Sequence, residues 1–467
     1  MSAPFLTLVE AARAMQAEYR GPDAPFTGVS TDTRAIAKDE LFFALSGERF
    51  DGSAFVADAL TKGALAAVVA RSALEGVGNA PRERLVVVDD PRLALGRLAA
   101  YWRERFTGPL LALTGSNGKT TVKEMTAAIL AVAAGGRERV LATVGNLNND
   151  IGVPLTLLRL NPQDHRYAVV EMGMNHAGEI AYLSGLASPD VALVNNAGVA
   201  HIENLRSREA IARAKGEIFS GLRPGGTAVI NADDQFAPQW SRAAAAHRQI
   251  TFALDRTADV RGKCTLRSDG STLAIETPAG SGAATLAVAG EHNARNALAA
   301  TAAAVALGVG IEAVVAGLAV YRGVKGRLQP KAGAAGAHLI DDTYNANPDS
   351  VAAAISVLAA ARGRRVLVLG DMGELGGDAA ALHAEVGDFA KAAGIDALYA
   401  LGTQSAHAVA SFGTNGRHFD SVQELVDAIR PELGAQVTVL VKGSRFMQME
   451  RVVAALAAPS ADRLAEH

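Results

Sequence analysis

Runs of consecutive apolar residues alternate with amphipathic, helix-like segments along most of this chain. Strands that are buried on both faces of a parallel sheet give such uninterrupted runs, because neither face meets water. The strands predicted in this way cover 110–115, 139–144, 167–173, 190–196 and 226–231, and then 338–342, 365–372, 397–402 and 436–443. Because helical segments separate them, the pattern predicts an α/β fold built on mostly parallel sheets.

Turn-forming residues between these segments predict three domains. Residues 1–108 form a small N-terminal α/β domain, which ends in a turn at Gly108-Pro109. Residues 109–322 form a central domain of the P-loop ATPase type, with a β-rich stretch at 249–290. Residues 323–467 form a C-terminal Rossmann-like α/β domain, but no G-x-G-x-x-G opens its first helix, so a dinucleotide role is not supported.

Composition narrows the class of protein. The formal net charge is only −3 over 467 residues, which is unlike the basic footprint of a nucleic-acid-binding protein. No apolar run reaches the length of about 18 residues that a membrane span needs, and the first residues lack the pattern of a secretory signal. A single cysteine, Cys264, fits a reducing compartment. We therefore expect a cytoplasmic protein without a membrane span or a nucleic-acid partner.

The segment 110–121, which reads LLALTGSNGKTT, has the form of a phosphate-binding loop. A buried strand ends in a glycine turn and a helix then opens with Lys-Thr, so backbone N–H groups and the helix N-terminus would face phosphate oxygens. Lys119 adds a positive charge and Thr120 offers a hydroxyl to Mg²⁺. Gly115 lies closer to Gly118 than in the common G-x-x-x-x-G-K-[ST] form, so the loop is a shortened variant.

Polar residues follow several of the predicted strands, where the ligands of an open α/β sheet collect. Glu171 ends one strand and His201 follows another, and a carboxylate and an imidazole beside a phosphate-binding loop can hold Mg²⁺. Taken singly, Glu171 also fits a solvated strand end and His201 a structural role. Lys215 belongs to a charged run on a helix, which usually marks a solvated face.

Taken together, these clusters resemble the Mur ligase family of peptidoglycan precursor synthesis, over essentially the whole chain. Glu171, His201 and Lys215 (in AKGEIF) match the family's strand-end glutamate, its metal-site histidine and the lysine that its members carry as a carbamate. The remaining matches are the shortened loop Thr114–Thr120, the G-x-H-N-x-x-N motif at Gly290–Asn296, and Gly326-Arg327. Two small departures are Ser116 in place of a common threonine and the absence of a proline before His201.

Four further motifs resemble those of the family members that add D-alanyl-D-alanine. They are GNLNNDIGVPLTLL, EMGMNHAGEI, DDTYNANPDS and GDMGELG, and no Asp-Asn-Pro-Arg motif of the diaminopimelate-adding members occurs. The resemblance implies ATP-dependent amide formation through an acyl phosphate, with ATP and Mg²⁺ as cofactors. The other partners that it implies are small molecules, a UDP-N-acetylmuramoyl-tripeptide and D-alanyl-D-alanine, and we expect a monomer.

The resemblance also implies roles for individual residues. Lys119, Glu171, His201 and Lys215 would be catalytic, and the metal ligands would be Thr120, Glu171, His201 and the carbamate of Lys215. The ATP-binding residues would be Gly115, Ser116, Asn117, Gly118, Lys119, Thr120, Thr121, Asn149, Asn296, Arg327 and Asp342. The substrate-binding residues would be Thr31, Arg34, Ser46 and Asp51 for the UDP-sugar, with Asn146, Asn148, Asn345, Asn347, Asp371, Lys442 and Arg445 for the peptide parts. The C-terminal domain would bind the dipeptide and close over ATP.

Two alternatives remain open at this point. The chain could be another ligase of the same superfamily, adding diaminopimelate or lysine or resembling folylpolyglutamate synthase, although a first domain of about a hundred residues argues against the last. It could instead be a P-loop switch, whose nucleotide state controls a protein partner. The third residue of the tripeptide, lysine or diaminopimelate, also stays open.

Overall fold

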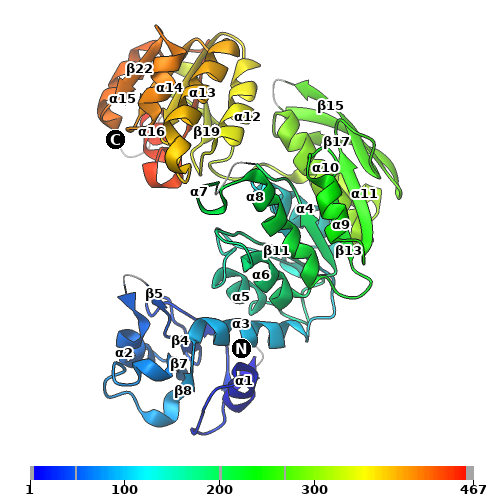
Figure 1. Cartoon of the computed structure of the whole chain (residues 1–467), viewed down its shortest axis with the longest axis vertical. Helices are drawn as coiled ribbons and strands as arrows, with labels where there is room; N and C mark the ends of the chain where they lie inside the picture. The colour runs from blue at the N-terminus through cyan, green and yellow to red at the C-terminus, as the bar shows by residue number, and fades with distance from the viewer. Residues whose placement is uncertain (1–4, 48–49, 199–201, 268–269, 459–467) are drawn as a thin grey trace, which may run out of the picture.

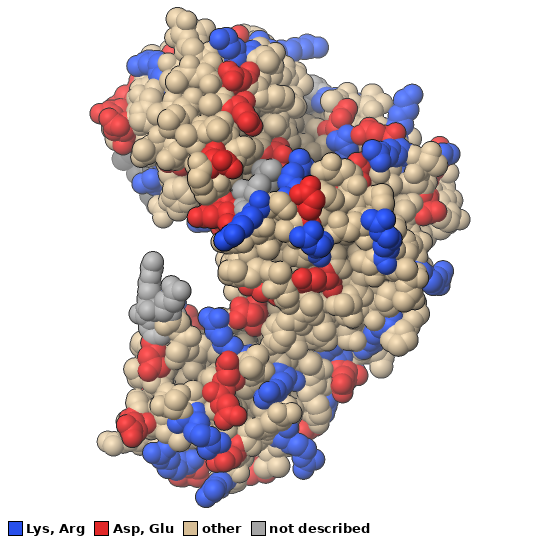
Figure 2. Space-filling model, viewed as in Figure 1, with Lys and Arg blue, Asp and Glu red and all other residues tan. Residues whose placement is uncertain are grey.

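The structure is a computed structural model, and it describes residues 5–47, 50–198, 202–267 and 270–458. Three main sheets of four, nine and six strands follow one another along the chain, with two further two-stranded pairs near the N-terminus. Figure 1 shows the three parts arranged as a crescent, with the first and the last at its two tips. Figure 2 shows the open space between those tips, and acidic and basic side chains interspersed over this face.

The first part is a four-stranded parallel sheet in the order β3-β4-β7-β8. Its helix α3 connects it to the centre: the Trp102 indole N–H donates to the Leu160 carbonyl at 2.9 Å, and the buried Arg103 guanidinium donates to the Ala187 carbonyl at 2.8 Å. The elements are β1 Leu6–Thr7, α1 Leu8–Met15, β2 Pro25–Phe26, β3 Val29–Ser30, β4 Leu41–Phe43, β5 Ser46–Gly47, β6 Phe50–Asp51, α2 Val56–Thr61, β7 Ala66–Ala70, β8 Leu85–Val88 and α3 Pro91–Arg103.

The central sheet has the order β10-β11-β9-β12-β13-β14-β15-β16-β17 and is parallel as far as β15. One face is covered by α4, α10 and α11 and the other by α5, α6 and α8. The elements are β9 Leu110–Thr114, α4 Lys119–Ala134, β10 Val140–Ala142, α5 Gly152–Leu157, β11 Tyr167–Glu171, α6 Glu179–Ala187, β12 Val191–Val194, α7 Ile202–Leu205, α8 Arg208–Gly216, β13 Thr227–Asn231, α9 Ala237–Ala243, β14 Arg248–Ala253, β15 Val260–Arg267, β16 Gly270–Thr277, β17 Gly280–Leu286, α10 Glu291–Ala306 and α11 Ile311–Val320.

The third sheet has the order β18-β19-β23-β20-β21-β22 and is parallel except for its edge strand β18. Helices α12, α13 and α14 cover one face, and α15 and α16 cover the other. The elements are β18 Gln329–Ala332, β19 His338–Asp342, α12 Pro348–Ala359, β20 Arg364–Gly370, α13 Ala379–Ala392, β21 Ala397–Leu401, α14 Ser405–Phe412, β22 Gly416–Phe419, α15 Val422–Ile429, β23 Val437–Lys442 and α16 Glu450–Leu456.

The predicted fold class is confirmed. Every strand that the apolar runs predicted is present, and all of them except β10 lie inside their sheets. The strands β18 and β22 were not predicted, because both are short edge strands whose sequences, QPKA and GRHF, contain no continuous apolar run. Residues 108 and 322 remain predicted domain limits; the central sheet begins at Leu110 and the third at Gln329. No helix in the described ranges is long and apolar enough to cross a membrane.

Candidate active site

The phosphate-binding loop follows β9, which lies between β11 and β12 in the central sheet. Helix α4 begins at Lys119, and Gly118 before it has a left-handed backbone with φ of 78°. A Cβ on Gly118 would lie 2.3 Å from Oδ1 of Asn296 and 2.8 Å from Nδ2 of Asn195. Only glycine therefore fits this position, for reasons of both backbone and space.

Asn195 and Asn196, which directly follow β12, hold the phosphate-binding loop through hydrogen bonds. The amide N–H groups of Ser116 and Asn117 donate to the backbone carbonyl and the side-chain oxygen of Asn196, at 3.0 and 2.9 Å. Asn195 Nδ2 donates to the Asn117 carbonyl at 2.9 Å and to Oδ1 of Asn296 at 3.0 Å. The sequence analysis gave no role to Asn195 or Asn196; their position at the end of a predicted strand was the signal that could have found them.

The side chain of Lys119 folds back over its own loop. Its ammonium donates to the carbonyls of Gly115 at 2.6 Å and Ser116 at 3.3 Å. Burial lowers the pKa of Lys119, and the carboxylate of Glu171 opposes this effect. A positive group held over a loop of backbone donors is suited to bind phosphate oxygens.

Glu171 ends β11 beside the loop and is 2% exposed. One carboxylate oxygen accepts from Asn148 Nδ2 at 2.9 Å, and the Glu171 N–H donates to the Thr143 hydroxyl at 2.9 Å. The other oxygen, Oε2, is buried and has no hydrogen-bond partner among the described residues. An unpartnered buried carboxylate oxygen is costly, so its position fits a cation. No group of three or more His, Cys, Asp and Glu gathers in the described ranges.

Lys215 lies on α8 and is 1% exposed. No hydrogen bond from its ammonium to any described residue is present. Burial lowers the pKa of Lys215 well below its usual value, and the charge of Lys119 lowers it further. The solvated helix face considered from its sequence is therefore wrong, because this side chain is buried. His201 lies outside the described residues.

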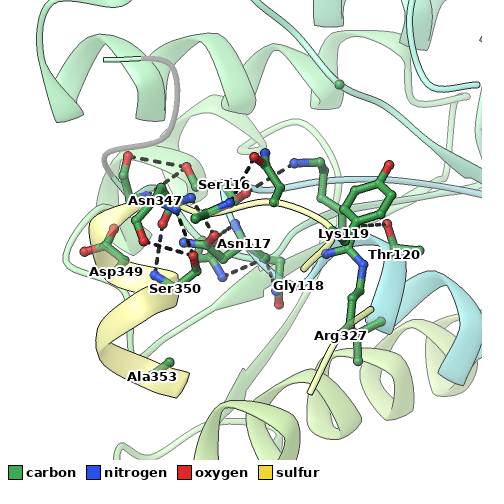
Figure 3. Close-up of a pocket in the computed structure, with 18 of the residues that line it drawn as sticks. Ser116, Asn117, Gly118, Lys119, Thr120, Arg327, Asn347, Asp349, Ser350 and Ala353 are labelled. Atoms are coloured by element: carbon green, nitrogen blue, oxygen red, sulfur yellow. Dashed lines mark hydrogen bonds between the residues drawn. The ribbon is translucent and has the colours of Figure 1, made fainter. Parts of the chain in front are cut away.

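The C-terminal part supplies a second wall (Figure 3). Arg327 Nη2 donates to the Thr120 hydroxyl at 3.0 Å, its guanidinium lies 4.2 Å from the centre of the Tyr344 ring, and its Nε is buried without a hydrogen-bond partner in the described part of the chain. Asn347 caps α12 and its Nδ2 donates to Oδ1 of Asn117 at 2.9 Å. Two contacts thus join this part directly to the phosphate-binding loop.

Residues of the loop, of the strand ends beside it and of the C-terminal wall, though not Lys215, line one cavity of about 940 Å³ between the central and the C-terminal parts. Three domain models of known families match the chain. The Mur ligase family catalytic domain matches residues 25–103, the Mur ligase middle domain 113–304, and the Mur ligase glutamate ligase domain 326–445. The chain belongs to the Mur ligase family.

Individual Mur ligases resemble this chain over nearly its whole length. The UDP-N-acetylmuramoyl-tripeptide–D-alanyl-D-alanine ligase of Escherichia coli K12 is 43% identical over 97% of this chain and 98% of its own. A crystal structure of MurF from Acinetobacter baumannii has a TM-score of 0.89 at 37% identity and covers 97% of this chain and 99% of its own. MurF from Thermotoga maritima in complex with ADP has a TM-score of 0.80 at 26% identity, covering 92% and 96%. Mur ligases are ATP-dependent enzymes that form amide bonds.

Most residues that the Mur ligase resemblance implies lie together in the cavity. They are Ser116, Asn117, Gly118, Lys119, Thr120, Thr121, Asn146, Asn148, Asn149, Glu171, Asn296, Arg327, Asp342, Asn345, Asn347, Lys442 and Arg445. Several of them are also bound to protein groups. Asn149 caps α5 through the Gly152 N–H at 2.9 Å, and the exposed Arg445 pairs with Glu450 at 2.9 Å.

Asp342 and Lys442 form a buried ion pair of 2.6 Å. Burial raises the pKa of Asp342, and the ammonium of Lys442 opposes that rise. Lys442 also donates to the Asn345 carbonyl at 3.0 Å, and Asp342 accepts from the Leu328 N–H at 3.1 Å. The pair therefore links β19, β23 and the segment after β19 on the C-terminal side of the cavity. The positive charge of Lys442 is neutralised by Asp342 in the absence of any substrate carboxylate.

A few of the implied residues do not line the cavity. Asp371 accepts from the Ser405 N–H at 2.8 Å and so holds the start of α14. In the N-terminal part, Arg34 pairs with Asp32 at 2.7 Å, while Asp51 accepts from the Ser46 hydroxyl at 2.8 Å. The remaining residues outside the cavity lining are Gly115, Thr31 and Lys215.

Proposed function

We propose that this chain joins D-alanyl-D-alanine to UDP-N-acetylmuramoyl-tripeptide, using ATP, and releases the UDP-muramoyl-pentapeptide, ADP and phosphate. The observation that carries the proposal is the 43% identity, over 97% of the chain, to a ligase of that name. The cavity supports it, because a phosphate-binding loop and groups from the C-terminal part line the same space. A P-loop switch would not need groups from the C-terminal part beside its nucleotide, so this shared cavity favours the ligase.

The first half-reaction transfers the γ-phosphoryl group of ATP to the free carboxylate of the tripeptide. Two anions must approach each other, so the site has to neutralise charge. Lys119 and Arg327 are placed to do so, once each exchanges its present contact for a phosphate oxygen. Glu171 Oε2 and the Thr120 hydroxyl would hold Mg²⁺, which when bound supplies further charge neutralisation at the phosphates.

Lys215 supports a second metal position. Carbon dioxide reacts with the neutral form of an amine, and burial favours that form of Lys215 by lowering its pKa. The resulting carbamate is an anion on a side chain that is otherwise cationic. We propose that this carbamate, together with His201, holds a second Mg²⁺ near the acyl group. The charge of Lys119 lowers the pKa of Lys215, so the two side chains lie near each other, and this supports a second metal position close to the phosphate-binding loop.

In the second half-reaction, the amine of the dipeptide attacks the acyl phosphate and phosphate leaves. We propose that the N-terminal domain, residues 1–108, holds the UDP-sugar and that the C-terminal domain, from residue 323, binds the dipeptide. Closure of that domain would keep water from the acyl phosphate. All of these groups belong to one chain, so we propose that it acts as a monomer, in the cytoplasm, where both nucleotide substrates are found.

The experiment is a measurement of ADP release with UDP-muramoyl-tripeptide, in the presence and absence of D-alanyl-D-alanine. Strict dependence on both substrates supports the ligase; steady ATP hydrolysis without either would favour the nucleotide switch. Running the assay with the lysine and the diaminopimelate tripeptides identifies the third residue. The Lys119→Ala variant should release no ADP, while Lys62→Ala, which alters an exposed ammonium on α2, should behave as wild type.

A further inference from the structure

Helix α4 carries a buried lysine that the roles above do not use. Lys123 lies one turn after Lys119, on the helix that follows the phosphate-binding loop, and is 1% exposed. A charged ammonium is costly to bury unless partners surround it. A methionine would fill a similar volume without that cost, so packing alone does not account for a lysine at this position.

The ammonium of Lys123 bonds to two groups of different kinds. It donates to the backbone carbonyl of Thr143 at 2.6 Å and lies 2.7 Å from Oε1 of Glu124. The Glu124 carboxylate is partly exposed and offsets the charge, whereas Thr143 is buried. Thr143 directly follows β10, so the ammonium ties α4 to the end of that strand.

The hydrogen bonds between β10 and β11 change at Thr143. Ala142 pairs with Val169, and the Thr143 N–H donates to the Val169 carbonyl at 3.1 Å. In a regular parallel ladder the next bond would run from the Glu171 N–H to the Thr143 carbonyl. The Glu171 N–H donates to the Thr143 hydroxyl at 2.9 Å instead, and the carbonyl accepts from Lys123. Both backbone groups are therefore satisfied, as buried groups must be.

This exchange fixes the residue that would bind Mg²⁺. The main chain of Glu171 is held by the Thr143 hydroxyl, and its Oε1 accepts from Asn148 at 2.9 Å, which leaves the buried Oε2 for a cation. The groups that hold a metal ligand in place contribute to the affinity for the metal. Neither Lys123 nor Thr143 lines the cavity, so any effect of theirs on the metal must pass through Glu171.

We propose that Lys123 is a positioning residue for Glu171 and acts through Thr143, an inference that rests on the proposed function. With its carbonyl bound to Lys123, Thr143 has its hydroxyl left to accept from the Glu171 N–H. β10 is a three-residue strand at the edge of the sheet, so α4 supplies the tie that a further strand would otherwise give. Glu171 is thus in place before nucleotide and metal arrive.

The test is ADP binding, measured by calorimetry over a series of Mg²⁺ concentrations and in EDTA. Lys123→Met keeps the length of the side chain but removes the donor. We expect it to raise the Mg²⁺ concentration for half-maximal tightening of ADP binding by about 10- to 100-fold, the usual cost of losing a group that holds a metal ligand. ADP binding in EDTA should keep its wild-type affinity.

Thr126→Val is the matched control. Its hydroxyl is also buried on α4, but it donates to the Val122 carbonyl of the same helix at 2.7 Å. The Mg²⁺ dependence of this variant should equal that of wild type. Urea unfolding of every variant ensures that binding is compared between folded proteins.

Thr143→Val tests the proposed route from a second position. It removes the hydroxyl, so it should raise the Mg²⁺ requirement as Lys123→Met does, and the double variant should be no worse than the worse single one. Two losses that multiply in the double variant, an equal loss of ADP affinity with and without Mg²⁺, or an unchanged Mg²⁺ requirement would each overturn the proposal. Wild-type protein that binds ADP with Mg²⁺ but does not couple D-alanyl-D-alanine would instead overturn the proposed function.

Discussion

The guanidinium of Arg327 donates a hydrogen bond to the hydroxyl of Thr120 at 3.0 Å, across 207 positions of sequence. The contact joins the C-terminal part to the first turn of α4. Both groups belong to the proposed ATP site, Arg327 at the phosphates and Thr120 at Mg²⁺. The same guanidinium that would bind ATP therefore holds the two parts together before ATP arrives.

Replacing Arg327 should remove one of the contacts between the central and the C-terminal parts and should also weaken catalysis. We expect Arg327→Ala to lower kcat/KM for ATP by about 10²- to 10³-fold, the usual cost of one lost donor to a developing charge. Arg322→Ala is the control, since its guanidinium donates to the carbonyls of Ala319 and Tyr321 in its own segment. Steady-state kinetics with varied ATP would check this; equal effects of the two variants would contradict the assignment of Arg327.

Two glycines at opposite ends of α4 allow a matched comparison. Gly118 and Gly135 both have φ of 78°, but a Cβ on Gly135 would meet nothing within 4 Å, whereas on Gly118 it would meet Asn296 and Asn195. Each alanine variant should lose roughly 1–2 kcal/mol of stability through backbone strain. Only Gly118→Ala should also lose ATP binding, measured by calorimetry. ATP binding that survives in Gly118→Ala would mean that the loop does not hold the phosphates.

Two buried lysines allow the carbamate to be tested. Lys215 has no hydrogen-bond partner in the described ranges, whereas Lys123, also 1% exposed, donates to the Thr143 carbonyl at 2.6 Å. We expect Lys215→Ala to lose ligase activity and to regain part of it with added short carboxylic acids, which replace the anion. Lys123→Ala should show no such rescue. The absence of rescue in Lys215→Ala at any acid concentration would count against a carbamate.

The imidazole of His383 should make stability depend on pH. It is fully buried, its Nε2 accepts from the Met372 N–H, and burial lowers the pKa of His383 from its usual 6.5. Its contribution is complete above pH 6.5 and is lost as the pH falls from there through the lowered folded pKa, since the unfolded chain then binds the extra proton.

The His383→Ala variant checks this expectation. It leaves the Met372 N–H unpaired, so we expect a loss of about 1–3 kcal/mol of unfolding free energy at pH 7.5. The difference from wild type should become smaller below pH 6.5, as measured by urea unfolding over a pH series. A difference that does not change with pH would show that the imidazole is not held neutral in the folded protein.

The apolar runs determined the strands of this protein, because a strand that is buried on both faces can tolerate few polar residues. The spacing of Gly115, Gly118 and Lys119 likewise predicted the glycine turn between β9 and α4, since a glycine turn between a strand and a helix is a local structure. The strands β18 and β22 escaped prediction for the converse reason: most of their side chains are partly or fully exposed, so no continuous apolar run marks them.

Only the tertiary structure decided how distant groups are used. The charged run around Lys215 indicated a solvated helix face, but the packing around α8 buries this side chain. The resemblance assigned Lys442 to the peptide substrate, and the fold pairs it with Asp342, a hundred positions away. Asn195 follows a predicted strand, but only the folded chain shows that its side chain joins the loop to Asn296. Burial, charge pairing and backbone strain depend on neighbours that are remote in sequence, and these neighbours become known only when the chain is folded.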